Sequence, residues 1–186
     1  MIRKAPRRVV TRVVEAYGHV DILIVNHAYS TQHPLDALTT DTLVAEEIDR
    51  HLLVNVRASL LLIAAFTHQH DGRSGGRVIL LTSGQHLGPM PTELAYAASK
   101  GALHQLTESL SYSLSERRIT VNTVNPGPTD TGYATEEAHK WVLKHMPQGR
   151  WGQPDDAARL IAWLVSDDAA WITGQVINSE GGFRRF

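Results

Sequence analysis

Short continuous runs of apolar residues alternate along this chain with longer stretches in which apolar residues recur every three or four positions. Runs of the first kind are typical of parallel strands covered on both faces, and the second spacing is typical of helices. The predicted strands are residues 21–26, 75–83, 119–127 and 174–182. The predicted helices are residues 6–17, 93–116, 136–145 and 155–165, together with a long helix from near Thr40 or Asp41 to about His68.

This alternation predicts an α/β fold. Successive strands joined by helices form a parallel sheet with helices on both faces, which is the doubly wound or Rossmann-like arrangement. The 186 residues contain no repeat, low-complexity tract or linker, and this length suits a single hydrophobic core. We therefore expect one domain that spans residues 1–186.

Composition narrows the range of partners. The longest apolar run, Leu60–Phe66, is far shorter than the roughly 18 residues of a membrane-spanning helix. The net charge of −1 lacks the basic excess that nucleic-acid binding needs. The basic start, MIRKAPRRVV, is not followed by the apolar core of a secretion signal. We expect a cytoplasmic protein with no membrane and no nucleic-acid partner.

Cysteine and histidine exclude two further kinds of site. The chain has no cysteine, so disulfides and thiol chemistry are excluded. Its 10 histidines lack the spacings of metal ligands, and no metal site is expected. His68 and His70, at the end of the long predicted helix, are interpreted as surface residues.

The candidate chemistry is concentrated in Tyr96, Lys100 and Ser83. Tyr96 and Lys100 are four residues apart near the start of a predicted helix, so their side chains share one face. Ser83 lies at the carboxyl end of the preceding strand, where open α/β sheets bind ligands. An ammonium group one turn away lowers the pKa of a phenol from its usual value of about 10, which allows proton exchange with a carbonyl or alcohol oxygen. Hydride must come from a cofactor, because no side chain can deliver it.

These residues, in this order, resemble the short-chain dehydrogenase/reductase family, of the 3-oxoacyl-[acyl-carrier-protein] reductase-like kind. The resemblance runs through nearly the whole chain. It makes the structural alternative, a half-buried tyrosine that merely lies beside a lysine, the weaker interpretation. The stretches that carry it are GHVDILIVNHAY (18–29), LLVNVRAS (52–59), YAASK (96–100), VNPGPTDTG (124–132) and WLVSDDAAWITGQVINSEGG (163–182).

The resemblance implies an oxidoreductase that transfers hydride between NAD or NADP and a small-molecule carbonyl/alcohol substrate, in a homo-oligomer (dimer or tetramer). Tyr96 would be the general acid/base, Lys100 would lower its pKa and hold the nicotinamide ribose, and Ser83 would bind the substrate oxygen. Asn55 would hold a water of the proton relay. The cofactor would contact Asn26, Ala28, Tyr96, Lys100, Pro126, Gly127, Thr129 and Thr131. The substrate side would comprise Gln85, Leu87 and Tyr133, with a lid loop whose Trp141, Leu143 and Met146 form an apolar wall.

Two features depart from the family pattern. The family's Asn-Asn-Ala-Gly reads Asn26-His27-Ala28-Tyr29 here, and we expect a side chain at Tyr29 to crowd the cofactor. No glycine-rich turn for the pyrophosphate occurs before Asp21. The sequence therefore predicts a fold truncated at its N-terminus by roughly sixty to seventy residues, with strand 21–26 as a bare edge. A fragment or misplaced gene start, a second subunit that covers the edge, and an adapted fold without cofactor all stay open.

Two other functions also stay open. A chain without its phosphate-binding turn could be a cofactor-free structural or assembly partner derived from the same fold. A halohydrin-dehalogenase-like protein would keep the tyrosine and serine without hydride chemistry, but such proteins carry arginine where this chain has Lys100, so this alternative ranks last. Neither the choice between NAD and NADP nor the identity of the substrate follows from the sequence.

Overall fold

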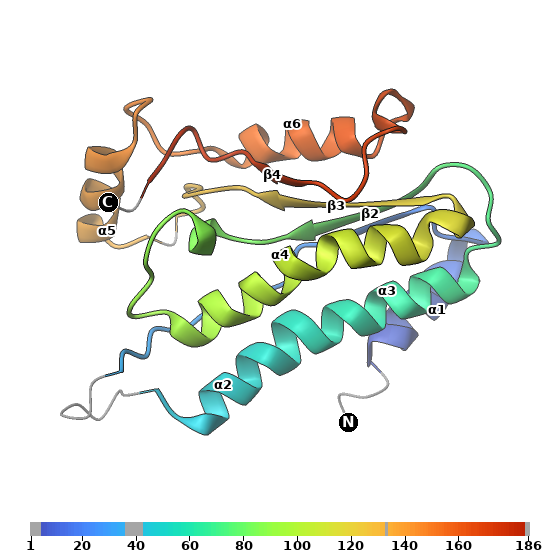
Figure 1. The fold of residues 1–186 in the computed structure, drawn as a ribbon, viewed down its shortest axis with the longest axis horizontal. Coiled ribbons are helices and arrows are strands. Elements are labelled where there is room, and N and C mark those ends of the chain that lie inside the picture. The colour runs from blue at the N-terminus through green and yellow to red at the C-terminus, as the bar shows by residue number, and fades with distance from the viewer. Residues whose placement is uncertain (1–4, 36–42, 133, 185–186) are drawn as a thin grey trace.

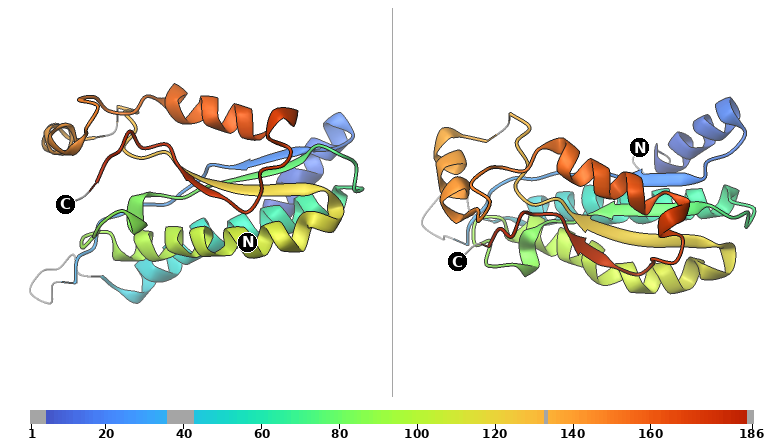
Figure 2. Two further views of the ribbon diagram at one scale, coloured as in Figure 1. Left: turned by 45° about the horizontal axis from the view of Figure 1, so that its top comes forward. Right: turned by 90° about the horizontal axis from the view of Figure 1, so that it is seen from above.

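The computed structural model describes residues 5–35, 43–132 and 134–184. Four parallel strands form one sheet, with helices on both of its faces (Figures 1 and 2). The order across the sheet is β1 (Ile22–Val25), β2 (Gly76–Leu81), β3 (Ile119–Asn125) and β4 (Val176–Asn178). The predicted α/β fold with a parallel sheet of the Rossmann-like type is confirmed.

The helices divide between the two faces of the sheet. Figure 2 shows α6 on one face and α3 and α4 on the other, and α1 packs beside α3. The boundaries agree with the predicted ones within a few residues, except that the predicted start at Thr40 or Asp41 lies outside the described residues. The helices of the described chain are α1 (Ala5–Tyr17), α2 (Ala45–His51), α3 (Ala58–Gln69), α4 (Leu94–Leu114), α5 (Glu136–His145) and α6 (Pro154–Leu164).

Strand β2 explains why both faces are covered. All of its residues are buried, and successive side chains of a strand point to opposite faces. Val78 and Leu80 enter the core beneath α3 and α4, whereas Ile79 and Leu81 enter a second core beneath α6. Burial of both sets of side chains fixes the register of the central strand and thus the position of the residues that follow it.

Strand β1 differs from the prediction that both of its faces are covered. It lies at one edge of the sheet, and Ile22 and Ile24 are exposed. Leu23 and Val25, which point to the opposite face, pack in the core beneath α3 and α4. The continuous apolar run therefore indicates a strand correctly, but only one face of that strand is covered by the described chain.

The strands β3 and β4 end earlier than predicted because of backbone constraints. β3 stops at Asn125, since Pro126 has no amide hydrogen to donate and Gly127 adopts the left-handed region with φ +65°. The predicted strand 174–182 shrinks to Val176–Asn178 between Gly174 (φ +73°) and Gly181 (φ +62°). Both strands nevertheless deliver their carboxyl ends to the same edge of the sheet.

The long helix that contains α2 and α3 carries a π-helical segment, Leu52–Arg57, between them. By length and composition the 25 residues of Ala45–Gln69 could cross a membrane. They pack against α4 and β1 instead, with His51, Asn55 and Ser59 buried. Buried polar groups on this face indicate packing inside a folded domain.

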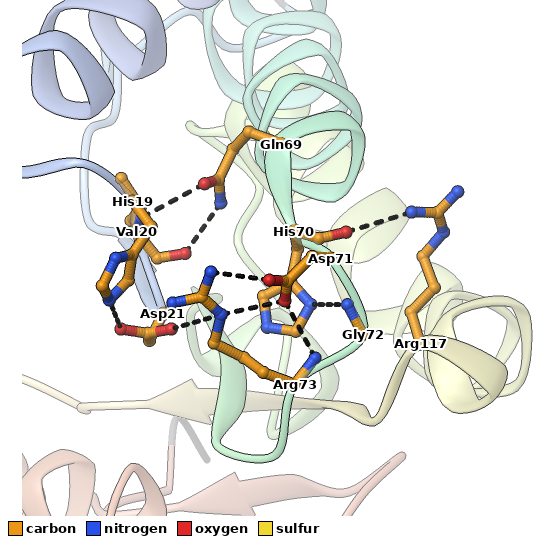
Figure 3. A network of polar contacts seen from close by, with 9 residues as sticks. All are labelled: His19, Val20, Asp21, Gln69, His70, Asp71, Gly72, Arg73 and Arg117. Atoms are coloured by element: carbon orange, nitrogen blue, oxygen red, sulfur yellow. Dashed lines mark hydrogen bonds and ion pairs between the residues drawn. The ribbon is translucent and has the colours of Figure 1, made fainter.

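A polar network closes the opposite, amino end of the sheet (Figure 3). The Gln69 amide donates to the carbonyl of Val20 at 2.7 Å and accepts from the Val20 amide at 3.2 Å, which ties α3 to the start of β1. Next to it, His70 is buried, so the prediction of a surface residue is wrong, whereas His68 is exposed as predicted. The reason is that α3 ends at Gln69, and the chain then changes direction so that the His70 ring lies against Phe66.

Candidate active site

A cavity of about 450 Å³ opens at the carboxyl ends of β2 and β3. Ser83, two residues beyond β2, lies in its lining together with Leu87. Asn125, the last residue of β3, lines the cavity as well. This is the edge at which open α/β sheets bind ligands. The structure thus brings the predicted Ser83 and Leu87 to one cavity.

Tyr96 and Lys100 lie in the first two turns of α4. Lys100 is only 2% exposed, and its Nζ donates a hydrogen bond to the carbonyl of Leu81 at 2.8 Å. The same Nζ lies 5.7 Å from the centroid of the Tyr96 ring. Burial lowers the pKa of Lys100 to about 8, so the ammonium form still predominates at neutral pH. A cation at this distance stabilises the phenolate form of a tyrosine.

Asn55 connects the loop after β1 to α4. It is fully buried within the π-helical segment, a distortion that is frequent at functional sites. Its Nδ2 donates to the carbonyl of Tyr29 at 2.8 Å and to Ser99 Oγ at 2.9 Å, and its Oδ1 accepts from the Tyr29 amide at 2.6 Å. Because Ser99 is next to Lys100, the Asn55 side chain fixes the start of α4 relative to the end of β1.

The side chain of Tyr29 turns toward α2. Its hydroxyl donates to Glu47 Oε2 at 2.9 Å, its ring lies 4.8 Å from the ring of His51, and the Arg50 guanidinium lies 4.9 Å from its centroid. The hydrogen bond from Tyr29, followed by one from Thr31, holds the pKa of Glu47 below its usual range. The expected crowding by Tyr29 is therefore not what the structure shows, because α2 holds the ring.

The residues predicted to contact the cofactor follow the carboxyl edge of the sheet. Asn26 and Ala28 are exposed beyond β1, and Gly127 lies in the lining of the cavity beyond β3, next to Pro126. The Thr129 hydroxyl donates back to the carbonyls of Pro126 (3.4 Å) and Gly127 (3.3 Å), and Thr131 is exposed. Thr129 thus stabilises its own turn, whereas the others lie along the edge.

This edge fits the nicotinamide half of a dinucleotide. An ammonium group has three donors, and the Leu81 carbonyl is the partner of Lys100 among the described residues, so donors remain for ribose hydroxyls. Asn26 and Ala28 are exposed, so a flat ring can approach the sheet edge beyond β1, whereas the missing side chain of Gly127 makes room for Glu180.

Known proteins match nearly the whole chain. A family profile described as enoyl-(acyl carrier protein) reductase matches residues 3–184. The uncharacterized oxidoreductase YjdA of Bacillus subtilis (strain 168) is 47% identical over 176 residues, which are 94% of this chain and 68% of that protein. The short-chain dehydrogenase/reductase from Serratia marcescens BCRC 10948 is 33% identical, with a TM-score of 0.86 over 96% of this chain and 71% of that structure. The chain belongs to the short-chain dehydrogenase/reductase family.

As a short-chain dehydrogenase/reductase, the protein is an NAD(P)-dependent oxidoreductase, and the cofactor-free assembly partner is not favoured. The 3-oxoacyl-[acyl-carrier-protein] reductase FabG of Rickettsia conorii (strain ATCC VR-613 / Malish 7) is 33% identical over 91% of this chain and 70% of its own length. The angucycline C-6 ketoreductase LanV with bound NADP is 31% identical, with a TM-score of 0.85 over 97% of this chain and 70% of that structure.

The substrate side of this short-chain dehydrogenase/reductase differs in part from the sequence prediction. Gln85 Nε2 donates to Thr82 Oγ1 at 3.2 Å, so the amide turns toward β2 and α4. Tyr133 lies outside the described residues. Leu143 and Met146 pack in a small core beneath α5, whereas Trp141 lines the cavity as expected. Val142, next to Trp141, belongs both to the lining and to this small core, so the core forms one side of the cavity.

Sequence reasoning also missed residues that reach the site from elsewhere. Trp151 and Phe183 line the cavity although they follow α5 and β4, respectively. His51 is fully buried, and its ring lies 6.4 Å from that of Tyr96. The signal for His51 is its spacing, four residues before Asn55 on one helix face, whereas Trp151 and Phe183 carry no local signal.

Proposed function

We propose that this protein transfers hydride between NAD(P) and a small carbonyl/alcohol substrate, with Tyr96 as the general acid/base. The observation that carries the proposal is the buried ammonium group of Lys100, 5.7 Å from the Tyr96 ring and at the end of the strand that leads to Ser83. Lys100 has no carboxylate partner among the described residues, and a buried charge of this kind is costly for a fold. This cost is understandable where the charge serves the reaction.

Lys100 acts on Tyr96 through charge. At neutral pH its ammonium form favours the phenolate and so makes the phenol a better proton donor. In reduction, Tyr96 would give its proton to the carbonyl oxygen as the alcohol forms, and in oxidation it would take the proton back. The proton source is thus a group whose acidity the fold itself sets.

Ser83 and Asn55 would position the reacting groups. The Ser83 hydroxyl, in the lining of the cavity, can donate a hydrogen bond to the same carbonyl oxygen and hold it near Tyr96. Asn55, through Ser99 and Tyr29, keeps α4 and the loop after β1 in fixed relation. The bound dinucleotide supplies the hydride, and Asn26, Ala28, Pro126, Gly127, Thr131 and Lys100 would hold its nicotinamide half.

The decisive experiment measures oxidation of NADH and of NADPH by the purified protein with a panel of ketones and aldehydes. We expect turnover with at least one cofactor and a loss of roughly a hundredfold or more in kcat for Tyr96→Phe, which removes only the hydroxyl. Tyr112→Phe, at an exposed tyrosine of the same helix, serves as the matched control. Turnover that is unchanged in Tyr96→Phe contradicts the assigned role.

Three further properties complete the proposal. We infer that the protein acts in the cytoplasm, since its relatives are oxidoreductases and its long apolar helix packs within the domain. We expect residues 1–186 to belong to one domain, and the single sheet of the described residues supports this. A homo-oligomer, dimer or tetramer, is the expected assembly, and sedimentation velocity tests it directly.

A further inference from the structure

We infer that the cavity beside Ser83 selects flat, uncharged aromatic ketones and the corresponding alcohols. The inference rests on the proposed function, because it names the substrate class of the same site. It is carried by the chemistry of the lining, in which aromatic rings form one wall and carboxylates occur without a lining lysine or arginine among the described residues.

The aromatic wall is rigid before any substrate arrives. The ring of Trp141, on α5, meets the ring of Phe183 edge-on at 5.9 Å and lies against the ring of His145 at 4.3 Å. The indole of Trp151 donates to the carbonyl of His139 at 3.1 Å and stacks on the ring of the same histidine at 5.0 Å. These contacts fix the orientation of both tryptophans, so they lose little freedom when a ligand binds.

The wall is accessible where a ligand would lie. Trp141 remains 43% exposed, so one part of its indole is free to stack on another ring, an arrangement that aromatic pairs prefer over contact with water. A cavity of about 450 Å³ lies within the usual size of small-molecule sites. The apolar side chains in its lining include Leu87, Ala138, Trp141, Val142, Trp151 and Phe183.

The charges in the lining disfavour anions. Glu180 is neutralised by Arg184, whose Nη1 lies 2.6 Å from Glu180 Oε1. Glu93, which directly precedes α4, has no ion-pair partner among the described residues. A carboxylate or phosphate on a substrate would therefore meet a like charge with no lining cation to compensate, and like charges brought together suppress binding. Keto acids and phosphate-bearing thioesters are thus the substrates that this cavity rejects.

The first test measures binding by calorimetry, with and without NADP⁺. The two ligands are naphthol, which is uncharged, and naphthoate, which carries a carboxylate on the same ring system. We expect naphthol to bind at least roughly tenfold more tightly than naphthoate, and Glu93→Gln to bring the two affinities within about threefold of each other. Trp141→Ala should weaken naphthol binding by roughly tenfold or more, whereas Trp141→Phe should keep most of it. Trp171→Ala, at a tryptophan that is 99% exposed, is the matched control.

The second test compares kcat/KM for acetylnaphthalene and butanone, and we expect the aromatic ketone to be preferred by roughly tenfold or more. If naphthoate binds as well as naphthol, or if Trp141→Ala binds naphthol as the wild type does, the inference is overturned, and reduction of butanone would leave the proposed function standing. If naphthol binds as expected but no ketone is reduced, the proposed function fails instead.

Discussion

The ring of His51 meets the ring of Tyr96 edge-on, with 6.4 Å between the two centroids. His51 is itself fixed by both of its nitrogens. Its Nδ1 lies 2.7 Å from the carbonyl of Glu47, which can only accept, and its Nε2 accepts from the Thr31 amide at 3.3 Å. Because both nitrogens have partners, the buried imidazole has one orientation and acts as a rigid support beside the tyrosine.

This contact makes His51 a positioning residue for Tyr96. We predict that His51→Leu lowers kcat by roughly ten- to a hundredfold, since small displacements of an acid/base group have effects of this size, while KM for the cofactor changes little. His51→Phe keeps an aromatic ring next to Tyr96 and should recover part of kcat. Steady-state kinetics with NADH and NADPH checks both variants.

His68→Leu is the control for this prediction, because His68 is exposed on the same long helix. A purely structural role for His51 would lower the amount of folded protein but leave kcat per folded molecule unchanged, and that outcome would contradict positioning.

Asn55 supports the site through hydrogen bonds rather than through direct contact with Tyr96. Asn55→Leu leaves the amide and carbonyl of Tyr29 without their hydrogen bonds to Asn55 and removes the donor to Ser99 Oγ. We expect a loss of about 3 kcal/mol in the free energy of unfolding. Ser99→Ala removes a single link to Asn55 and should cost about 1 kcal/mol. Urea unfolding of the three proteins measures the difference, and equal losses in both variants would refute the ranking.

We expect the buried charge of Lys100 to lower the free energy of unfolding while it supports turnover. Lowering its pKa from 10.5 to about 8 by burial corresponds to a cost of about 3 kcal/mol at neutral pH. Lys100→Met removes this cost but also the bond to the Leu81 carbonyl, worth about 1 kcal/mol, so we predict a net gain of about 2 kcal/mol together with loss of turnover. Lys140→Met, at an exposed lysine paired with Glu136, should change stability little. A Lys100→Met variant that is less stable than the wild type contradicts the prediction.

The same pKa sets a pH dependence. The folded state binds a proton at Lys100 less readily than the unfolded state does, so the wild type should gain stability as the pH rises from about 8 toward 10.5. Activity should move the other way, because carbonyl reduction needs the ammonium charge and should fall above about pH 8. Lys100→Met should lack this rise in stability when urea unfolding is measured across the same range.

Local pattern was enough to predict most of the fold. The apolar run before Ser83 and the helix that carries Tyr96 and Lys100 follow from periodicity, and α5 was predicted at its observed bounds, Glu136–His145. Strand ends depended on backbone geometry, since proline at Pro126 and the left-handed glycines stop pairing. The exposed face of β1 could not be predicted, because an apolar run does not reveal which of its sides is covered.

Residues of the candidate site that belong to one sequence motif could be predicted. Contacts between residues that are far apart in the sequence could not. Ser83 and Leu87 line the cavity, on the side where the resemblance places the substrate. Gln85 is not among the lining residues, because its amide donates a hydrogen bond to Thr82 Oγ1. The orientation of Tyr29 depends on Glu47, a contact between residues 18 positions apart that no periodicity indicates. Polar contacts of this kind can be recognised only in the folded structure.

His70 gives the domain a sensitivity to acid. Its buried Nδ1 accepts from the Gly72 amide at 3.2 Å, and its Nε2 has no hydrogen-bond partner among the described residues. Burial lowers the pKa of His70 from 6.5, although Asp71 and Asp21 oppose this effect and Arg73 and Arg117 add to it (Figure 3). As the pH falls below 6.5, the unfolded chain takes up the proton first, so the free energy of unfolding decreases until the folded pKa is reached.

Replacement of His70 should therefore flatten the pH dependence of stability. His70→Asn keeps an oxygen that can accept from the Gly72 amide but cannot be protonated in this range. We predict that its free energy of unfolding falls less than that of the wild type between about pH 7.5 and pH 5.5, measured by urea unfolding. His68→Asn, at the exposed neighbour, should retain the wild-type slope. If His70→Asn loses stability as steeply as the wild type, the acid sensitivity originates in another group, because no other change separates the two proteins.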